Sequence, residues 1–209
     1  IIDKTDTRIE DSPAGWGAID RIRISAWRGR DNDTELYLAN LAREGADAPL
    51  VIVRGDSAAK SSPEEGRSVV VFAKAVATVL DTLGLPYAVM SDLDVTADRL
   101  QGKTVAVLPH NPNLPDRVAG ELATYVEAGG KLLVFYLLPP RLAALVGIQT
   151  GPHRRQAYPG RFASIRAEGE GLVGLPAVVK QRSWNIHHAA PIPERSRVVA
   201  AWFDEKGQP

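Results

Sequence analysis

The chain has 209 residues, and its 25 lysines and arginines balance 25 aspartates and glutamates, so the formal net charge is zero. Hydrophobic residues make up 44% of the sequence and charged residues 24%, as in ordinary globular proteins. The charge balance argues against a nucleic-acid or membrane-surface protein. The lack of cysteine excludes disulfides, Cys-ligated zinc, Fe–S clusters and thiol nucleophiles, and no apolar run approaches the roughly 20 residues of a membrane helix.

Residues 1–48 are mixed in character. Alternating apolar and polar residues at 22–27 predict a half-buried strand, and residues 34–44 predict a short helix. This segment is either an N-terminal extension or the tail of a preceding domain. The abrupt ends of the chain at Ile1 and Pro209 lead us to expect a piece of a longer polypeptide, with its neighbouring domains as partners. The compartment is left open, with an extracytoplasmic location as one option.

Residues 49–148 alternate between short apolar runs and helical patterns. Continuous apolar runs of this kind are typical of strands that are covered on both faces. They occur at residues 50–53, 87–90, 103–108 and 132–135.

Helix signals separate these runs. Ser62 and Pro63 predict the start of a long helix, with Glu65 closing a capping box and Gly84 ending the helix. Pro115 predicts the start of a second helix, which the glycine pair at 129–130 ends, and residues 139–147 predict a short third helix.

This order of strands and helices implies parallel pairing through right-handed crossovers. We therefore predict an α/β fold, a flavodoxin-like doubly wound, mostly parallel sheet over residues 49–148. Residues 149–209 are rich in Pro, Gly and Arg and carry short strand patterns at 162–166, 177–180 and 197–203. They predict a loop-rich β extension that packs on the core and adds strands to an edge of its sheet.

Two segments carry a family resemblance. Residues 119–134, AGELATYVEAGGKLLV, and residues 100–109, LQGKTVAVLP, resemble the class I glutamine amidotransferase-like superfamily. Within it they are most similar to the trimerisation domains of β-galactosidases and to similar domains of glycoside hydrolases. The resemblance covers residues 49–148 and implies the fold predicted above.

The resemblance also bears on catalysis. Catalytic members of the superfamily carry a nucleophilic Cys at the sharp turn after the last of these strands. Here that turn, residues 136–139, reads Tyr-Leu-Leu-Pro and holds neither Cys nor Ser nor Thr. The resemblance therefore implies a member without amidotransferase chemistry, and we assign no catalytic residue.

In a doubly wound sheet, ligands collect outside the carboxyl ends of the strands. We expect the polar residues that follow the four strands to converge there and to suit a hydroxyl-rich ligand such as a sugar. These residues are Arg54, Asp56, Asp92, His110, Asn111 and Tyr136. Asp56 and Asp92 would suit a glycosidase acid/base pair if their carboxyl groups lay about 5 to 9 Å apart.

A metal site is not expected. His187 and His188 are adjacent, and adjacent residues of a strand face opposite sides, so both cannot easily bind one ion. Further ligands would have to come from distant residues such as His110 or His153. No other cofactor is indicated by a motif.

Three hypotheses about function follow. The first is a non-catalytic, amidotransferase-like domain of a larger carbohydrate-related protein, serving assembly, with homo-oligomerisation as one form, or completing a substrate cleft. The second is a glycoside-type hydrolase acting through the strand-end crevice. The third is a small-molecule or sugar-binding module. The first predicts an exposed apolar patch on the segments that flank the α/β core, larger than the few hundred Å² usual for a monomer. The other two predict a pocket at the strand ends.

Overall fold

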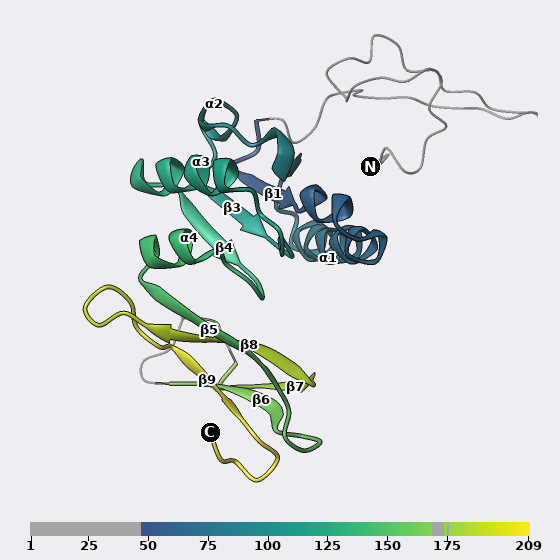
Figure 1. The fold of residues 1–209 in the computed structure, drawn as a ribbon, viewed down its shortest axis with the longest axis vertical. Coiled ribbons are helices and arrows are strands. Elements are labelled where there is room, and N and C mark those ends of the chain that lie inside the picture. Colours follow the sequence, from purple (N-terminus) through teal and green to yellow (C-terminus); the bar gives the residue numbers. More distant parts are fainter. Residues whose placement is uncertain (1–46, 169–173, 175) are drawn as a thin grey trace, which may run out of the picture. The chain divides into compact units, whose positions relative to one another are not determined.

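The computed structural model describes residues 47–168, 174 and 176–209. These residues fall within one compact unit, Arg43–Pro209. They form a four-stranded parallel sheet with helices, followed by two antiparallel sheets (Figure 1). A helix long and apolar enough to cross a membrane is not found among them. The strand and helix predicted at 22–27 and 34–44 lie outside the described residues.

The parallel sheet contains all four predicted strands of the 49–148 region, with bounds within two residues of the predicted ones. Its strands are β1 (Leu50–Arg54), β2 (Tyr87–Ser91), β3 (Val105–Leu108) and β4 (Lys131–Val134). Their order is β2-β1-β3-β4, and every neighbouring pair is parallel. This order agrees with a flavodoxin-like sheet over four strands. The complete doubly wound assignment stays a prediction.

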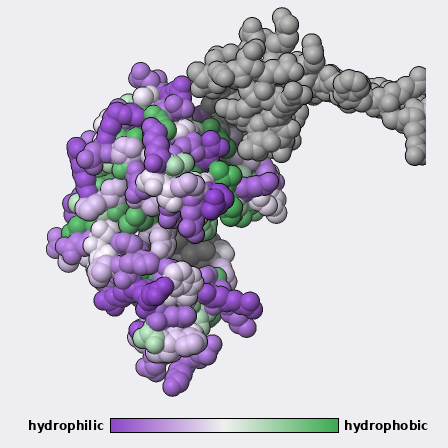
Figure 2. Space-filling model, turned by 45° about the vertical axis from the view of Figure 1, so that its right-hand side comes forward, coloured by the Kyte–Doolittle hydropathy of each residue, from purple (hydrophilic) through white to green (hydrophobic). Residues whose placement is uncertain are grey.

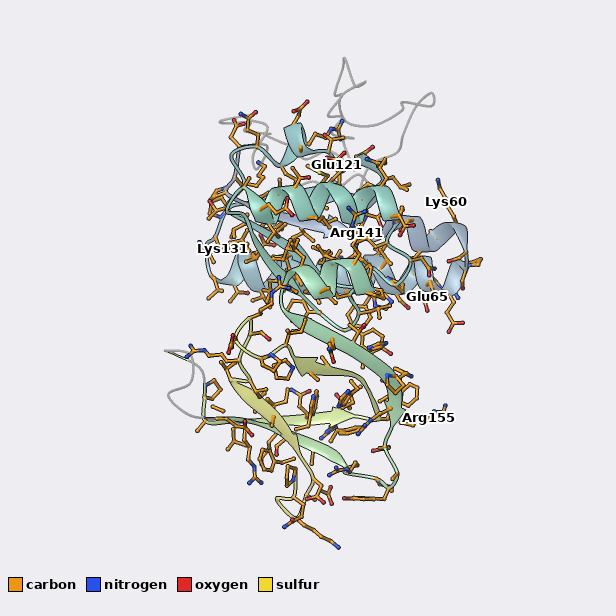
Figure 3. All side chains as sticks on the ribbon, turned by 60° about the vertical axis from the view of Figure 1, so that its left-hand side comes forward. Lys60, Glu65, Glu121, Lys131, Arg141 and Arg155 are labelled. Atoms are coloured by element: carbon orange, nitrogen blue, oxygen red, sulfur yellow. The ribbon has the colours of Figure 1, made fainter. Side chains whose placement is uncertain are left out.

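Helices fill the crossovers between these strands. The α-helices are α1 (Pro63–Thr82), α2 (Ala97–Leu100), α3 (Asp116–Glu127) and α4 (Pro140–Leu145), and the short 3₁₀ helices are η3 (Asp56–Lys60) and η4 (Asp92–Asp94). The main hydrophobic core lies between one face of the sheet and α2, α3 and α4. A hydrogen bond of 2.7 Å from the Ala97 backbone N–H to the Glu121 carboxylate ties α2 to α3. Figure 3 shows the position of Glu121.

The predicted start of α1 is confirmed. The Ser62 hydroxyl oxygen accepts the backbone N–H groups of Glu64 and Glu65, at 3.2 and 3.4 Å, and Pro63 is the first helical residue. The Glu65 carboxylate does not follow the capping-box prediction, because it accepts a hydrogen bond from His110 instead. Gly84, with φ of +64°, follows the helix as predicted.

The C-terminal strands pair differently from the prediction. β5 (Ile148–Arg155) pairs with β8 (Asn185–Pro191), and β6 (Phe162–Ala167) lies between β7 (Val178–Ser183) and β9 (Ala200–Phe203). All these pairs are antiparallel. The expectation that these strands extend the parallel sheet is therefore wrong. They form two sheets of their own, in one of which the Phe162 and Trp202 rings pack at a centroid distance of 5.8 Å.

The carboxyl ends of β1 and β3 approach each other at Gly55. A Cβ at this position would lie 2.4 Å from the His110 carbonyl oxygen and 3.0 Å from Asn111 Cα. Both neighbours belong to the backbone, so they cannot swing aside as a flexible side chain can. The residue after β1 must therefore be glycine for the strand ends to meet as they do.

We predict that Gly55→Ala lowers the free energy of unfolding by about 1–3 kcal/mol, because the added methyl group forces the two strand ends apart. Urea denaturation followed by circular dichroism measures this change. Gly120→Ala is the matched control, because α3 leaves nothing within 4 Å of an added Cβ there. The control should be neutral or stabilising by up to about 1 kcal/mol. Equal effects of the two substitutions would contradict the prediction.

Candidate functional site at the strand ends

The six residues predicted to bind a ligand all lie at the carboxyl ends of the parallel strands. Arg54 ends β1, Asp56 begins η3, and Asp92 begins η4 directly after β2. His110 and Asn111 follow β3, and Tyr136 follows β4. The contacts divide them into two groups. Arg54, Asp56, Asp92 and Asn111 interact around η3 and η4, whereas His110 and Tyr136 pack ring against ring at a centroid distance of 5.8 Å.

Asp92 is fully buried, and Ser57 holds both of its carboxylate oxygens. The Ser57 backbone N–H donates to Oδ1 at 2.9 Å, and the Ser57 hydroxyl donates to Oδ2 at 2.5 Å. Burial raises the pKa of Asp92, and the nearby charge of Asp56 raises it further. Hydrogen bonds from Ser57 and Asn111 act in the opposite direction, because they stabilise the ionised form. Asp92 therefore fastens η3 to η4 and offers no exposed oxygen to a ligand.

Asn111 is also buried. Its side-chain Nδ2 donates to the Val53 carbonyl oxygen at 3.1 Å, which joins the end of β3 to β1. Its Oδ1 atom has no hydrogen-bond partner. The amide thus supports the close approach of the two strands at Gly55.

Arg54 and Asp56 form an ion pair with each other. Arg54 Nε lies 2.7 Å from Asp56 Oδ1, and Arg54 Nη2 lies 3.0 Å from Asp56 Oδ2. This bidentate geometry is the strong form of a guanidinium–carboxylate ion pair. Both charges that the sequence offers at the end of β1 therefore have a protein partner close by.

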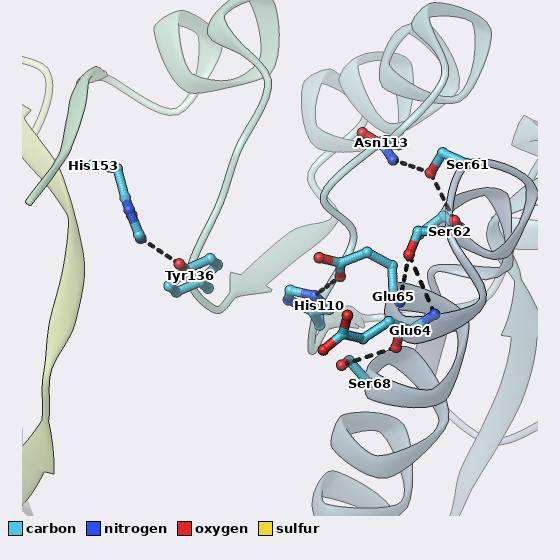
Figure 4. A network of polar contacts seen from close by, with 10 residues as sticks. Ser61, Ser62, Glu64, Glu65, Ser68, His110, Asn113, Tyr136 and His153 are labelled. Atoms are coloured by element: carbon cyan, nitrogen blue, oxygen red, sulfur yellow. Dashed lines mark hydrogen bonds and ion pairs between the residues drawn. The ribbon is translucent and has the colours of Figure 1, made fainter. Parts of the chain in front are cut away.

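His110 is held between α1 and the loop after β4. Its Nε2 atom lies 2.9 Å from Glu65 Oε2, and its side chain is 11% exposed. The Phe72 ring on α1 lies 5.2 Å from the imidazole, centroid to centroid. In Figure 4 the Glu65 carboxylate reaches from α1 toward His110. The Glu65–His110 pair links the first turn of α1 to the end of β3.

Tyr136 takes a backbone conformation that is rare for residues with a side chain. Its φ is +68°, in the bend directly after β4, and the residue is 47% exposed. Its hydroxyl oxygen lies 2.5 Å from Nε2 of His153, which comes from β5 (Figure 4). A non-glycine residue with positive φ is strained, and such strain is found mainly where the surroundings hold a side chain in a required position.

Three residues of this region were not predicted as members of the strand-end site: Ser57, Glu65 and His153. Ser57 lies 35 positions from Asp92, Glu65 lies 45 from His110, and His153 lies 17 from Tyr136. Since each pairing joins elements through the fold, a single sequence carries no direct signal for it. The sequence did single out Glu65 and His153, but with other partners.

The described residues contain no group of three or more His, Asp or Glu side chains arranged to hold a metal ion. Two surface cavities, of about 230 and 350 Å³, lie elsewhere, one lined by parts of β6 and β7 and the other by residues near α2. Neither is lined by any of the six predicted residues. A ligand-binding role for those six residues stays a prediction.

Comparison with known proteins gives structural neighbours alone. No protein-family model and no curated protein matches the sequence. A ThuA-like protein from Bacteroides uniformis is similar in structure, with a TM-score of 0.54 and 16% identity over 79% of this chain and 71% of that chain. A β-galactosidase from the haloarchaeon Halorubrum lacusprofundi has a TM-score of 0.52 and 19% identity over 78% of this chain.

The matched part of this chain spans 25% of the length of that β-galactosidase. At these identities the similarity establishes a shared fold alone. The amidotransferase-like resemblance seen in the sequence is therefore supported as far as the fold.

The raised pKa of Asp92 predicts a pH-dependent stability. Between the unfolded value of 3.8 and the raised folded value, the native state binds more protons than the unfolded state, so the free energy of unfolding falls as pH rises. Asp92→Asn removes this contribution, so its stability relative to the wild type should improve as pH rises through that window. Urea denaturation at a series of pH values above 3.8 measures the difference.

Ser57→Ala provides the second arm of this test. It removes the hydroxyl that stabilises the charged carboxylate, so the pKa of Asp92 should rise further and the falling limb should extend to higher pH. A stability difference between the wild type and Asp92→Asn that is independent of pH would contradict the assignment.

Proposed function

We propose that this chain is a non-catalytic assembly domain of a carbohydrate-related protein. We propose further that it associates with a second copy of itself through the face of the parallel sheet on which α1 lies, here called the α1 face. The observation that carries the proposal is the exposed apolar surface on both sides of α1.

One row of side chains across the sheet defines this surface. Val89, Ile52, Val107 and Leu133 stand side by side in the parallel register, so they share one face of the sheet. The two central residues are buried, at 0% and 3% exposure, whereas Val89 is 51% and Leu133 49% exposed. Burial therefore stops at the two outer strands.

The width of a helix accounts for this pattern. An α-helix with its side chains is about 10–12 Å wide, and neighbouring strands are about 4.8 Å apart, so one helix covers about two strands. Within the described part of the chain, α1 is the helix that packs on this face against β1, with Val69 and Ala73 buried. The opposite face is covered by α2, α3 and α4.

The exposed part of α1 carries several apolar side chains. Five of its large hydrophobic side chains, or of those directly after it, are between 45% and 64% exposed: Val70, Val71, Phe72, Val79 and Leu83. Figure 2 brings the α1 side forward and shows hydrophobic residues reaching the surface there among hydrophilic ones. A patch of this kind on a soluble domain is typical of a protein–protein contact.

The polar strand ends support a structural role over a catalytic one. Asp92 and Asn111 are buried and hydrogen bonded to neighbouring elements, and Asp56 is paired with Arg54. The fold similarity to a β-galactosidase favours a carbohydrate-related protein. Among such proteins the sequence resembles trimerisation domains, which favours a second copy of this chain as the partner.

Sedimentation-velocity ultracentrifugation of the full chain over a concentration series tests the proposal. We expect reversible self-association, and a rise of about tenfold or more in the dissociation constant for the double variant Val79→Glu/Leu133→Glu, because each carboxylate would be buried in the contact. Thr124→Glu on the exposed side of α3 is the matched control and should associate as the wild type does. Thermal unfolding should confirm that all variants are folded.

A wild-type chain that stays monomeric at every concentration would overturn the proposal. So would association that the double variant and the Thr124→Glu control weaken to the same extent.

A further inference from the structure

One phenol and two imidazoles form a cluster where the bend after β4 meets β5 and β8. It consists of Tyr136, His153 and His187, and we refer to it as the Tyr–His–His cluster. The Tyr136 hydroxyl lies 2.5 Å from His153 Nε2, the two imidazole centroids are 6.0 Å apart, and the Tyr136 and His187 centroids are 6.3 Å apart. Each ring therefore neighbours the other two.

The pairing of β5 with β8 brings the two histidines together. His153 stands directly opposite His187 in the antiparallel register, and residues directly opposite each other point to the same face. An irregularity between Thr150 and His153 adds one residue to β5. If the register of Thr150 with Ala189 continued unshifted through this chain, Ile186 would stand opposite His153, so the shift is what lets His153 face His187. Bulges of this kind often re-aim a side chain at a site.

The third member comes from the parallel sheet. The positive φ of Tyr136 turns its side chain out of the bend after β4, toward His153 (Figure 4). A second pair backs it, since the His110 ring lies 5.8 Å from the Tyr136 ring and is hydrogen bonded to Glu65. Tyr136 is half exposed and His153 is exposed, so a small solute can reach both.

We propose that the Tyr–His–His cluster binds a divalent transition-metal ion, Cu²⁺ in preference to Zn²⁺. Imidazole nitrogen suits both ions, and copper is the more tightly bound of the two at N/O sites. Metal–ligand bonds of about 2.0–2.1 Å at roughly tetrahedral or square angles place donor atoms about 3 Å apart. The phenol oxygen and His153 Nε2 are already at nearly that separation.

Binding would replace the phenol proton by the metal ion. The Tyr136 oxygen forms a bond to the metal, and its proton leaves to solvent, so the cluster supplies one anionic oxygen and two neutral nitrogens. Solvent completes the coordination of the ion. The site differs from the His and carboxylate groups that were considered above, because its third donor is a phenol.

Titration of the untagged full chain with Cu²⁺, and separately with Zn²⁺, tests this proposal. Isothermal titration calorimetry should give one equivalent of Cu²⁺, bound about tenfold or more tightly than Zn²⁺. Electron paramagnetic resonance should detect hyperfine coupling to two nitrogens. A visible phenolate-to-copper charge-transfer band should also form and should be absent in Tyr136→Phe.

His187→Ala should weaken Cu²⁺ binding about tenfold or more and remove one nitrogen coupling. His188→Ala is the matched control, because this next residue lies on the opposite face of β8, against Gly151, and should bind Cu²⁺ as the wild type does. Absence of saturable Cu²⁺ binding, equal losses in His187→Ala and His188→Ala, or a charge-transfer band that survives Tyr136→Phe would each overturn the proposal.

Discussion

The close approach of β1 and β3 at their carboxyl ends constrains the rest of the α/β part. Gly55 leaves room for the His110 carbonyl, and this brings Asn111 within hydrogen-bonding distance of the Val53 carbonyl. Ser57, two residues further on, then reaches the buried Asp92 after β2. Three strand ends are thereby fixed to one another by polar groups that water would otherwise solvate.

The burial of these polar groups limits which residues can bind a ligand. A carboxylate or amide that is buried and hydrogen bonded to stabilise strand ends has fewer free atoms for a ligand. The surface that remains available lies on the apolar side of α1 and around Tyr136, the exposed member of the strand-end residues. These two surfaces differ in chemistry, one apolar and the other made of donor atoms, and each proposal rests on one of them.

The sequence predicted the elements whose signals are local. The four apolar runs became the four parallel strands because buried strands need apolar residues on both faces. Ser62 and Pro63 marked the start of α1 because capping involves residues two and three positions apart. The convergence of the six polar residues at one edge followed from the parallel sheet.

What the sequence could not predict depends on contacts between distant segments. Glu65 had two candidate partners, its own helix cap and a histidine 45 residues away, and only the fold decides between them. β5 was missed because Gly151 and Pro152 interrupt its strand pattern, and β8 because Ile186 is its one large apolar residue. The pairing of His153 with His187 depends on a register that no local pattern encodes.

The extra residue in β5 has an evolutionary consequence. Ala189 and His187 are two positions apart on β8 and share a face, so Thr150 and His153, which stand opposite them, also share a face although three positions separate them. The bulge takes up the odd residue, and the side chains beyond it keep their sides. Loss of that residue through a single-codon deletion would restore a regular ladder with the same facing pairs, whereas the same deletion in a regular strand would move its side chains to the other face.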